Sequence, residues 1–563
     1  MLNESMAEVM VVGLFLLGAA VLPREVRKHL CLAFAQLSKR HRVASVCGIG
    51  ALLIAVRLCC LPILPRPTPV IPDEHSNLLL GRTLAAGKCA NPVHPMWRHF
   101  ETLFILQQPT YASVYPPAQG LILAIGLILF GEPWAGVLGS MAGMSMVVVW
   151  MLRAYETRVW ALYGGLLSVA GYGILSYWTN SYWGGAGAAI GGALALGGLP
   201  RMLSSNRRRD AAILGLGLLV LATSRPYEGF LTALPIAFYV VRHFSRAAVG
   251  DTAVLRKQAP VFACVILAGG ILICWYNWRV TGSPVRLPHA AYIQQYAAAP
   301  AFIWQRAQRA PVYRDRVLRE AHLSFGIDYA EYSTLIGAAG KTFKKISRIA
   351  IFYWGPLWVL VLLTFPEFIR ERRFRVVLLS LAFCITGILL TVGFQVHYAA
   401  PCTSIFILML VYASRCFYTH LKRAGTVVVI AAPLAWVGSQ ALTRQTPLLP
   451  NSMLMRPSVE ARVAGERGRH LVIVHYGPSH PLGEEWVYNE PDVDHSRVIW
   501  ARDLGPQANE ELFQYYPERV FWLVEPDHPR PLVIRCTPGC TIPEDEPASP
   551  TGSVAGHSLP FGR

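Results

Sequence analysis

The sequence is dominated by apolar runs of 12 to 20 residues that are separated by short polar or basic connections. A membrane-spanning helix needs about 20 consecutive apolar residues. Only 15% of the residues are charged, whereas soluble domains carry about 25%, so much of the surface is expected to face lipid. The sequence therefore predicts a mainly α, polytopic bundle of about 12 spans, at residues 6–22, 43–62, 133–152, 159–177, 183–200, 210–223, 230–241, 259–278, 348–365, 375–393, 399–414 and 425–441.

Basic residues divide the connections between these runs into two groups. Six connections, at 23–42, 153–158, 201–209, 242–258, 366–375 and 415–424, hold 23 Lys and Arg residues. The alternate short connections, at 178–182, 224–229 and 394–398, hold only Arg225. Because Lys and Arg concentrate in cytoplasmic loops, the basic group is predicted to be cytoplasmic. The second group then lies outside the cell, together with the long outer loops 63–132 and 279–347 and the C-terminal segment.

The apolar segment 116–131 disturbs this alternation if it crosses the membrane. Pro116-Pro117 opens the segment, and proline favours a break or a helix start at that point. We expect a juxtamembrane or re-entrant segment. The alternative is that it spans and that one of the shorter runs does not.

The chain divides by composition into four predicted parts: 1–42, an N-terminal span with a basic cytoplasmic loop; 43–441, a transmembrane domain; 442–534, a small extracytoplasmic α/β domain; and 535–563, a disordered tail rich in Pro, Gly and Ser. In the third part, alternating apolar residues predict strands at 470–476, 497–501 and 519–524, with a helix at 509–516. In the tail, Cys536 and Cys540 could form a disulfide if this segment is extracytoplasmic. No pair of CxxC motifs indicates a zinc site.

The first cluster of chemically informative residues is Asp73-Glu74, in the sequence IPDEH about ten residues after the run 43–62. Adjacent carboxylates at the membrane boundary are costly unless they are solvated or used. The leucines that follow suggest an amphipathic helix on the membrane surface. The structural alternative is that Asp73 caps this helix.

A second cluster is the stretch YWTNSYWGG at 177–185, which contains Asn180, Tyr182 and Trp183. Amide and hydroxyl groups at the mouth of a helix bundle can orient a sugar, so these residues are predicted to bind substrate. The alternative for the aromatic residues is a belt at the membrane interface.

The third and fourth clusters contain Arg225 with Glu228, and His397 with Tyr398. Arginine presents a planar fork of donors that fits a phosphate, so Arg225 is predicted to bind phosphate, with His397 assisting and with Glu228 and Tyr398 contacting substrate. The alternatives are an ion pair between Arg225 and Glu228, and a structural or metal-binding role for His397. All four clusters fall on the predicted outer face, which favours one active site there.

This organisation resembles the GT-C fold of integral-membrane glycosyltransferases, and in particular the superfamily of protein O-mannosyltransferases, aminoarabinose transferases and their dolichyl-phosphate-mannose-transferase-like bacterial members. In that superfamily a span leads into a long outer loop with an acidic motif, here Asp73-Glu74, followed by segments such as Gln108–Tyr111 and Tyr115–Gly120. The resemblance covers roughly residues 43–441. The polar stretch His75–Asn77, the extra span 6–22 and the C-terminal domain depart from the family pattern.

The resemblance implies transfer of a sugar, with inversion, from a polyprenyl-phosphate donor to an acceptor hydroxyl of a glycan, lipid or protein. Asp73 would be the general base, with Glu74 as the second choice, and Arg225 would stabilise the leaving phosphate. No cofactor is expected, and a divalent metal is not favoured because few carboxylates are present. Nucleic acid is not an expected partner. The protein would lie in the cell inner (cytoplasmic) membrane, with its active site outside.

Two competing hypotheses are a transporter or flippase of lipid-linked sugars, and a non-catalytic scaffold or sensor. A transporter would need ionisable residues inside its spans. The only carboxylates in the apolar runs are Glu8 and Asp210, which lie near the ends of their runs. Arg57 and Arg415 are expected to snorkel to the interface. A scaffold leaves the polar clusters on one face unexplained.

Overall fold

The computed structural model describes residues 2–39, 42–250, 252–443, 451–481, 484–528 and 530–536. Most of the expected disordered tail and Cys540 lie outside these residues. Cys536 is disulfide-bonded.

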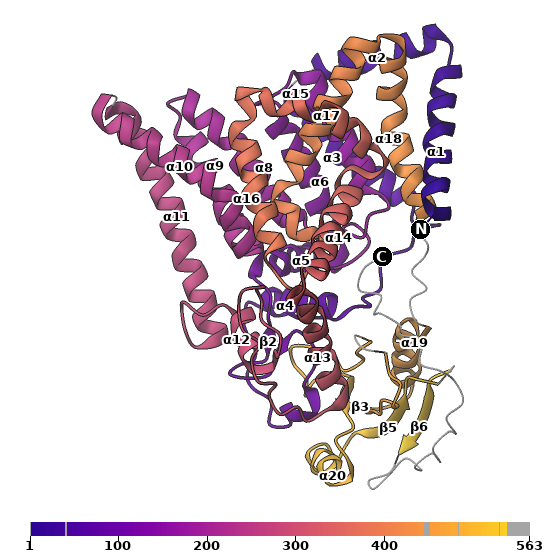
Figure 1. Ribbon diagram of the computed structural model, residues 1–563. Coiled ribbons are helices and arrows are strands. Elements are labelled where there is room, and N and C mark those ends of the chain that lie inside the picture. Colours follow the sequence, from indigo (N-terminus) through magenta and orange to yellow (C-terminus); the bar gives the residue numbers. More distant parts are fainter. Residues whose placement is uncertain are drawn as a thin grey trace.

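Helices make up most of the described chain (Figure 1). The α-helices are α1 (Leu2–Val21), α2 (Arg24–Lys39), α3 (Arg42–Cys59), α4 (Pro72–Ala85), α5 (Pro117–Phe130), α6 (Pro133–Leu152), α7 (Arg158–Ser168), α8 (Ala186–Ser204), α9 (Arg208–Ser224), α10 (Pro226–Gly250), α11 (Thr252–Thr281), α12 (Pro288–Tyr296), α13 (Arg316–Ala330), α14 (Leu335–Trp354), α15 (Trp358–Arg370), α16 (Arg375–Leu389), α17 (Thr403–Leu421), α18 (Arg423–Thr443), α19 (Asn451–Gly465) and α20 (Pro506–Tyr515). Short helical turns are η1 (Trp97–Phe100), η2 (Val169–Gly173), η3 (Glu331–Ser333), η4 (Gly355–Leu357), η5 (Arg372–Phe374) and η6 (Val396–Cys402). The strands are β1 (Ile105–Leu106), β2 (Ala112–Ser113), β3 (His470–Val474), β4 (Val498–Arg502), β5 (Val520–Glu525) and β6 (Leu532–Cys536).

Six helical stretches in the described part of the chain are long and apolar enough to cross a membrane: Pro133–Leu152, Ala186–Ser204, Thr252–Thr281, Leu335–Arg370, Val396–Leu421 and Arg423–Leu442. A bent pair, Arg24–Lys39 with Val43–Cys59, would make a seventh. The chain is thus a multi-pass membrane protein. The expected number of twelve remains a prediction, because several expected spans form shorter helices. The run 159–177, for example, forms the 11-residue α7 and then the π-helical turn η2.

The segment 116–131 forms α5, a helix of 14 residues. At a rise of 1.5 Å per residue it is about 21 Å long, less than the roughly 30 Å of a bilayer's hydrocarbon core. It ends at Gly131, whose φ of 67° favours glycine, and turns into α6, where the Glu132 side chain accepts from the Trp134 backbone N–H. Its length favours the prediction that this segment does not cross fully.

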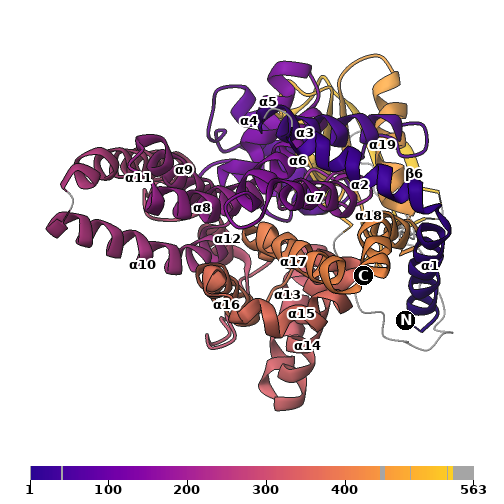
Figure 2. The ribbon, with the colours of Figure 1, turned by 90° about the horizontal axis from the view of Figure 1, so that it is seen from above.

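Glycine allows neighbouring helices of the bundle to approach closely. An added Cβ at Gly217 of α9 would lie 2.5 Å from the backbone nitrogen of Ala195 in α8. Small residues thus let α8 and α9 pack with their backbones in close contact. Seen from above, α9, α10 and α11 project to one side of the molecule, whereas α1, which packs against α18, lies at the opposite edge (Figure 2).

The C-terminal part contains a four-stranded sheet of order β4-β3-β5-β6, in which β3 pairs in parallel with β4 and β5, and β6 is antiparallel to β5. β3, β4, β5 and α20 fall where strands and a helix were expected, and β6 is an additional strand. Successive side chains of a strand point to opposite faces. Val472, Val474 and Trp522 pack with α19, whereas Leu471, Ile473 and Leu523 pack with α20 and with residues of the outer loop 63–132.

The basic connections and the sheet lie at opposite ends of the bundle. In Figure 1, α2, the C-terminal end of α10, the N-terminal end of α11 and the α17–α18 connection lie at the top, and α4, α12, α13 and the sheet lie at the bottom. The two groups of connections separated by charge in the sequence are thus separated in space.

Candidate active site

The N-terminal turn of α4 carries the acidic pair. Ile71 is extended and Pro72 is the first helical residue, so Asp73 and Glu74 lie in the first turn, where the helix dipole favours negative charge. The Tyr115 hydroxyl donates a hydrogen bond to Asp73 Oδ1. Burial raises the pKa of Asp73, against the lowering effects of this hydrogen bond and of the Arg225 charge. The Asp73 residue as a whole is half-buried, and its carboxylate lies next to the Tyr115 phenol and within the field of Arg225.

Glu74 is only 4% exposed, and backbone groups occupy both of its oxygens. Its Oε2 accepts from the N–H groups of Val70 (2.9 Å) and Ile71 (3.2 Å), and its Oε1 accepts from that of Tyr182 (3.0 Å). Burial raises the pKa of Glu74 to about 7, although these hydrogen bonds lower it. Glu74, the second choice for the general base, is therefore better explained as a structural residue that joins the outer loop to the 177–185 stretch.

Asn180 and Tyr182 also use their polar groups within the protein. The Asn180 amide donates to the carbonyls of Ile174 (2.9 Å) and Ser176 (2.8 Å) and accepts from Arg57 Nε (3.1 Å). The Tyr182 hydroxyl donates to the Pro67 carbonyl at 3.0 Å. These contacts favour a structural role over the predicted contact with substrate.

The position of Arg57 also differs from the sequence prediction that it snorkels to the membrane interface. Its side chain is fully buried, with 0% exposure, and it donates to the carbonyls of Leu64 (2.9 Å) and Pro65 (3.1 Å) in addition to Asn180. It lies within the protein and does not snorkel. Arg415, in contrast, is 30% exposed and pairs with Glu156.

Arg225 lies at the break between α9 and α10, where Pro226 begins the next helix. Its guanidinium carbon lies 4.6 Å from the centre of the Tyr398 ring. Its charge interacts with Asp73, Tyr115, Tyr177, Glu228, His289, His397 and Tyr398. An ion pair requires a nitrogen–oxygen distance of at most 4.0 Å. In the described part of the chain, no carboxylate oxygen, those of Glu228 included, lies this close to a guanidinium nitrogen of Arg225. The alternative of an Arg225–Glu228 ion pair is not observed.

His397 is 2% exposed and lies among aromatic rings. Its Nδ1 and the Tyr177 hydroxyl form a hydrogen bond of 2.9 Å, and the Trp183 ring meets it edge-on with 4.6 Å between centroids. His397 is thus a buried neighbour of Tyr398, with 5.4 Å between ring centroids, and lies within the field of Arg225.

Five of the nine predicted site residues share one electrostatic environment around Arg225: Asp73, Arg225, Glu228, His397 and Tyr398. Trp183 contacts this group through the His397 ring. Glu74, Asn180 and Tyr182 make structural hydrogen bonds next to it. Sequence reasoning missed Tyr115, Tyr177 and the solvent-exposed His289 of α12. Tyr115 was visible only as part of a family motif, and no pattern marks His289.

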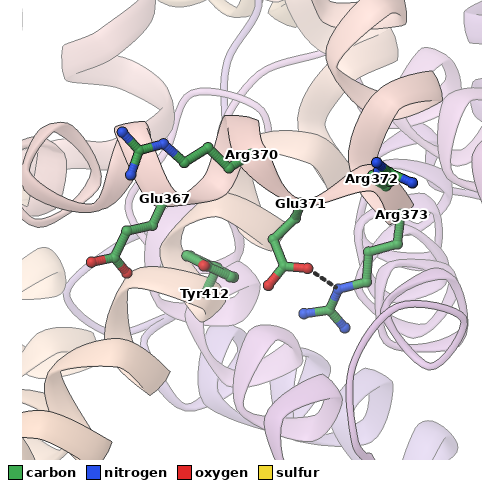
Figure 3. Close-up of a pocket in the computed structure, with 6 residues that line it drawn as sticks. All are labelled: Glu367, Arg370, Glu371, Arg372, Arg373 and Tyr412. Atoms are coloured by element: carbon green, nitrogen blue, oxygen red, sulfur yellow. Dashed lines mark ion pairs between the residues drawn. The ribbon is translucent and has the colours of Figure 1, made fainter.

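A cavity of about 610 Å³ lies elsewhere, at the C-terminal end of α15 (Figure 3). It is lined by Glu367, Arg370, Glu371, Arg372, Arg373 and Tyr412. Arg373 pairs with Glu371 at 3.4 Å and with Glu156 at 3.2 Å. α15 reaches the end of the bundle opposite α4, so this cavity belongs to the basic face and contains none of the predicted site residues.

Carboxylate, histidine and cysteine side chains do not gather into a metal site in the described residues, where no group of three or more could hold an ion. Around Arg225 the carboxylates are Asp73 and Glu228, and Glu228 is only 6% exposed.

Comparisons with known proteins give structural likenesses at low sequence identity. No family model and no curated protein matches the sequence. Among solved structures, the chain is similar to ArnT from Cupriavidus metallidurans bound to undecaprenyl phosphate (14% identity, TM-score 0.43, 84% of this chain and 92% of that one). It is also similar to the oligosaccharyltransferase of Archaeoglobus fulgidus in the apo form (11% identity, TM-score 0.42, 86% of this chain and 70% of that one). At these TM-scores the likenesses assign no activity to this chain.

Proposed function

We propose that the protein is a membrane glycosyltransferase that moves a sugar from a polyprenyl-phosphate donor to an acceptor hydroxyl at the extracytoplasmic face. The observation that carries the proposal is the arrangement of Asp73 and Arg225, a carboxylate and a cation that share one site without forming an ion pair. This site lies at the end of the bundle opposite the basic connections, which the positive-inside rule assigns to the cytoplasm.

In the proposed reaction, Asp73 accepts the proton of the acceptor hydroxyl while the hydroxyl oxygen attacks the anomeric carbon of the donor. The bond from that carbon to the phosphate oxygen breaks, and the lipid phosphate leaves. A single displacement of this kind inverts the anomeric configuration. Proton removal by a positioned base contributes about 10²–10⁴-fold, and the hydrogen bond from Tyr115 holds Asp73 in one orientation.

Arg225 is assigned to the leaving phosphate. A guanidinium is always charged and matches phosphate oxygens with paired donors. Stacking on Tyr398 fixes its plane. His397 contacts Tyr398 and is itself held by Tyr177 and Trp183. The proposed reaction uses no metal, because the oxygens of Glu74 already accept backbone N–H groups and Glu228 is buried.

The experiment measures transfer of radiolabelled sugar by purified protein in lipid nanodiscs, from a mixture of polyprenyl-phosphate sugars to cell-envelope acceptors. The variants are Asp73→Asn and Arg225→Ala, with Glu367→Gln at the distal cavity as the matched control. We expect transfer by the wild-type protein and by the control, and a loss of more than about 10²-fold in Asp73→Asn at unchanged thermal stability.

Equal activity of Asp73→Asn and wild type would exclude Asp73 as the base. If the wild-type protein transfers no sugar from any donor but moves lipid-linked sugars across vesicle membranes, the transferase proposal is wrong and the protein is a transporter.

A further inference from the structure

One face of α4 meets a short segment of the C-terminal sheet region. His75, Leu79 and Arg82 are spaced so that they share a helix face. The His75 ring stacks on that of Tyr488, with 4.1 Å between centroids and 4° between planes. Seven residues further along α4, Arg82 forms an ion pair of 2.5 Å with Glu490. Residues 488–490 therefore run along the helix that begins with the proposed base.

A third contact comes from the outer loop that carries β1 and β2. The Tyr111 hydroxyl donates to the Asn489 carbonyl at 2.9 Å. Three consecutive residues of the C-terminal part thus each contact the α4 region, through a ring, a backbone carbonyl and a charge.

The segment 486–490 is itself fixed within the C-terminal part. Arg456 of α19 donates to the carbonyls of Trp486 (2.9 Å) and Tyr488 (3.1 Å). The Asn489 side chain forms two hydrogen bonds of 2.8 Å with the backbone of Trp500 in β4. The segment therefore presents a rigid surface to α4.

A shared apolar core and a buried charge network surround these contacts. Leu79 and Phe100 pack in one cluster with Leu471, Ile473 and Tyr488. Arg502, only 1% exposed, donates to the Glu101 carbonyl at 2.6 Å and pairs with Asp315 at 2.8 Å. The C-terminal part and the outer loops thus share one folded interior.

The state of His75 favours a permanent contact. Burial lowers the pKa of His75 well below its ordinary value, and the charges of Arg456 and Arg82 lower it further. The ring is therefore neutral at neutral pH and stacks on Tyr488 without a desolvated charge. Because His75 lies two residues after Asp73, holding its ring fixes the rotation of the first turn of α4.

We propose that the C-terminal domain is a positioning element of the catalytic unit, in which residues 486–490 dock on α4 and hold Asp73 in the orientation that the transfer reaction needs. This inference rests on the proposed function. It gives the domain a role different from acceptor recognition, because the docking contacts are made with the helix of the base. Tyr488 is a positioning residue.

The first test compares Tyr488→Ala with Tyr488→Phe, which keeps the stacking ring. Misalignment of a reacting group by about 1 Å can cost 10²-fold, so we expect kcat of Tyr488→Ala to fall by about 10-fold or more, with KM for the donor unchanged. Tyr488→Phe is expected to restore kcat. Thermal stability is measured for both variants, and equal kcat in Tyr488→Ala and wild type would overturn the inference.

A charge exchange provides a test that does not depend on the folding of Tyr488→Ala. Arg82→Glu and Glu490→Arg each place like charges opposite one another, and the double variant restores an ion pair. We expect lower kcat in each single variant and recovery in the double variant. If the double variant is as impaired as the singles combined, residues 82 and 490 do not act through their contact.

Hydrogen–deuterium exchange separates the inference from the proposed function. In Tyr488→Ala, amides of residues 72–85 are expected to exchange faster, while those of residues 403–421 in the bundle are unchanged. This outcome supports the docking even if the wild-type protein shows no transferase activity. Unchanged exchange in residues 72–85 would overturn the docking even if transferase activity is found.

Discussion

Asp73 and Glu74 are neighbours in the sequence but have different partners. Successive residues of an α-helix point about 100° apart. Asp73 therefore meets Tyr115 and the field of Arg225, whereas Glu74 turns toward the backbone of Val70 and Tyr182. Asp73 is only half-buried, whereas both oxygens of Glu74 accept hydrogen bonds that join two loops.

At this scale, Tyr115→Phe is expected to change the pH dependence of transfer. The Tyr115 hydrogen bond lowers the pKa of Asp73, so its removal raises that pKa. A base must be deprotonated to act, so the acidic limb of the kcat/KM profile should move to higher pH. The measurement is kcat/KM against pH through the acidic and neutral range.

Tyr182→Phe is the matched control, since its hydroxyl bonds to the Pro67 carbonyl and not to Asp73. Its acidic limb should stay in place. A limb that moves to lower pH in Tyr115→Phe, or moves equally in both variants, would contradict the role of Tyr115.

At the scale of elements, the mouth of the bundle is built where helices break. The chain leaves helical structure after η2 and resumes it at α8, and Asn180 lies in this interval. Arg57 extends from α3 to tie the interval to Leu64 and Pro65. Backbone carbonyls that are not paired within helices are thus satisfied by a buried cation.

Arg57→Met should destabilise this region. It leaves the buried Leu64 carbonyl and the partly buried Pro65 carbonyl and Asn180 amide oxygen without these donors, and an unsatisfied buried group costs about 1–3 kcal/mol. The expected result is a clearly lower apparent Tm in thermal unfolding of the detergent-solubilised protein.

Arg66→Met is the comparison variant, because Arg66 pairs with Glu132 on the surface at 64% and 30% exposure, and exposed pairs contribute about 0–1 kcal/mol. Equal shifts of Tm in the two variants would show that the buried hydrogen bonds of Arg57 add nothing.

At the scale of the whole molecule, the membrane part and the sheet region form one folded unit at the end of the bundle that carries α4. Leu79, Phe100 and Tyr111 from the first outer loop share an apolar cluster with strands β3, β4 and β5. Burial of apolar surface contributes about 25 cal/mol per Å², so a shared core of this kind resists separation.

A protease site inserted between Thr443 and Asn451 tests this unity. After cleavage, the two fragments should co-elute in size-exclusion chromatography and dissociate only in denaturant. The same cleavage in a His75→Ala, Arg82→Ala variant should release the C-terminal fragment more readily. Separation of the wild-type fragments without denaturant would mean that the shared core does not hold them.

The sequence by itself determined the local features of this protein. Apolar runs and the one-sided distribution of Lys and Arg predicted a membrane helix bundle with two chemically different ends, and alternating apolar residues predicted β3, β4 and β5. Polar clusters on the outer side also marked Asp73 and Arg225. These features were predictable because helical and strand periodicity, lipid exposure and loop charge each depend on residues that are close together in the sequence.

Only the tertiary structure decided which groups meet. The pattern around Asp73-Glu74 gave no sign that Glu74 bonds to Tyr182, that Arg57 is buried against Asn180, or that Tyr488 stacks on His75. Each of these contacts joins residues more than a hundred positions apart, so no local period encodes it. Packing of whole elements sets such contacts, and it separated the accessible carboxylate from the structural one.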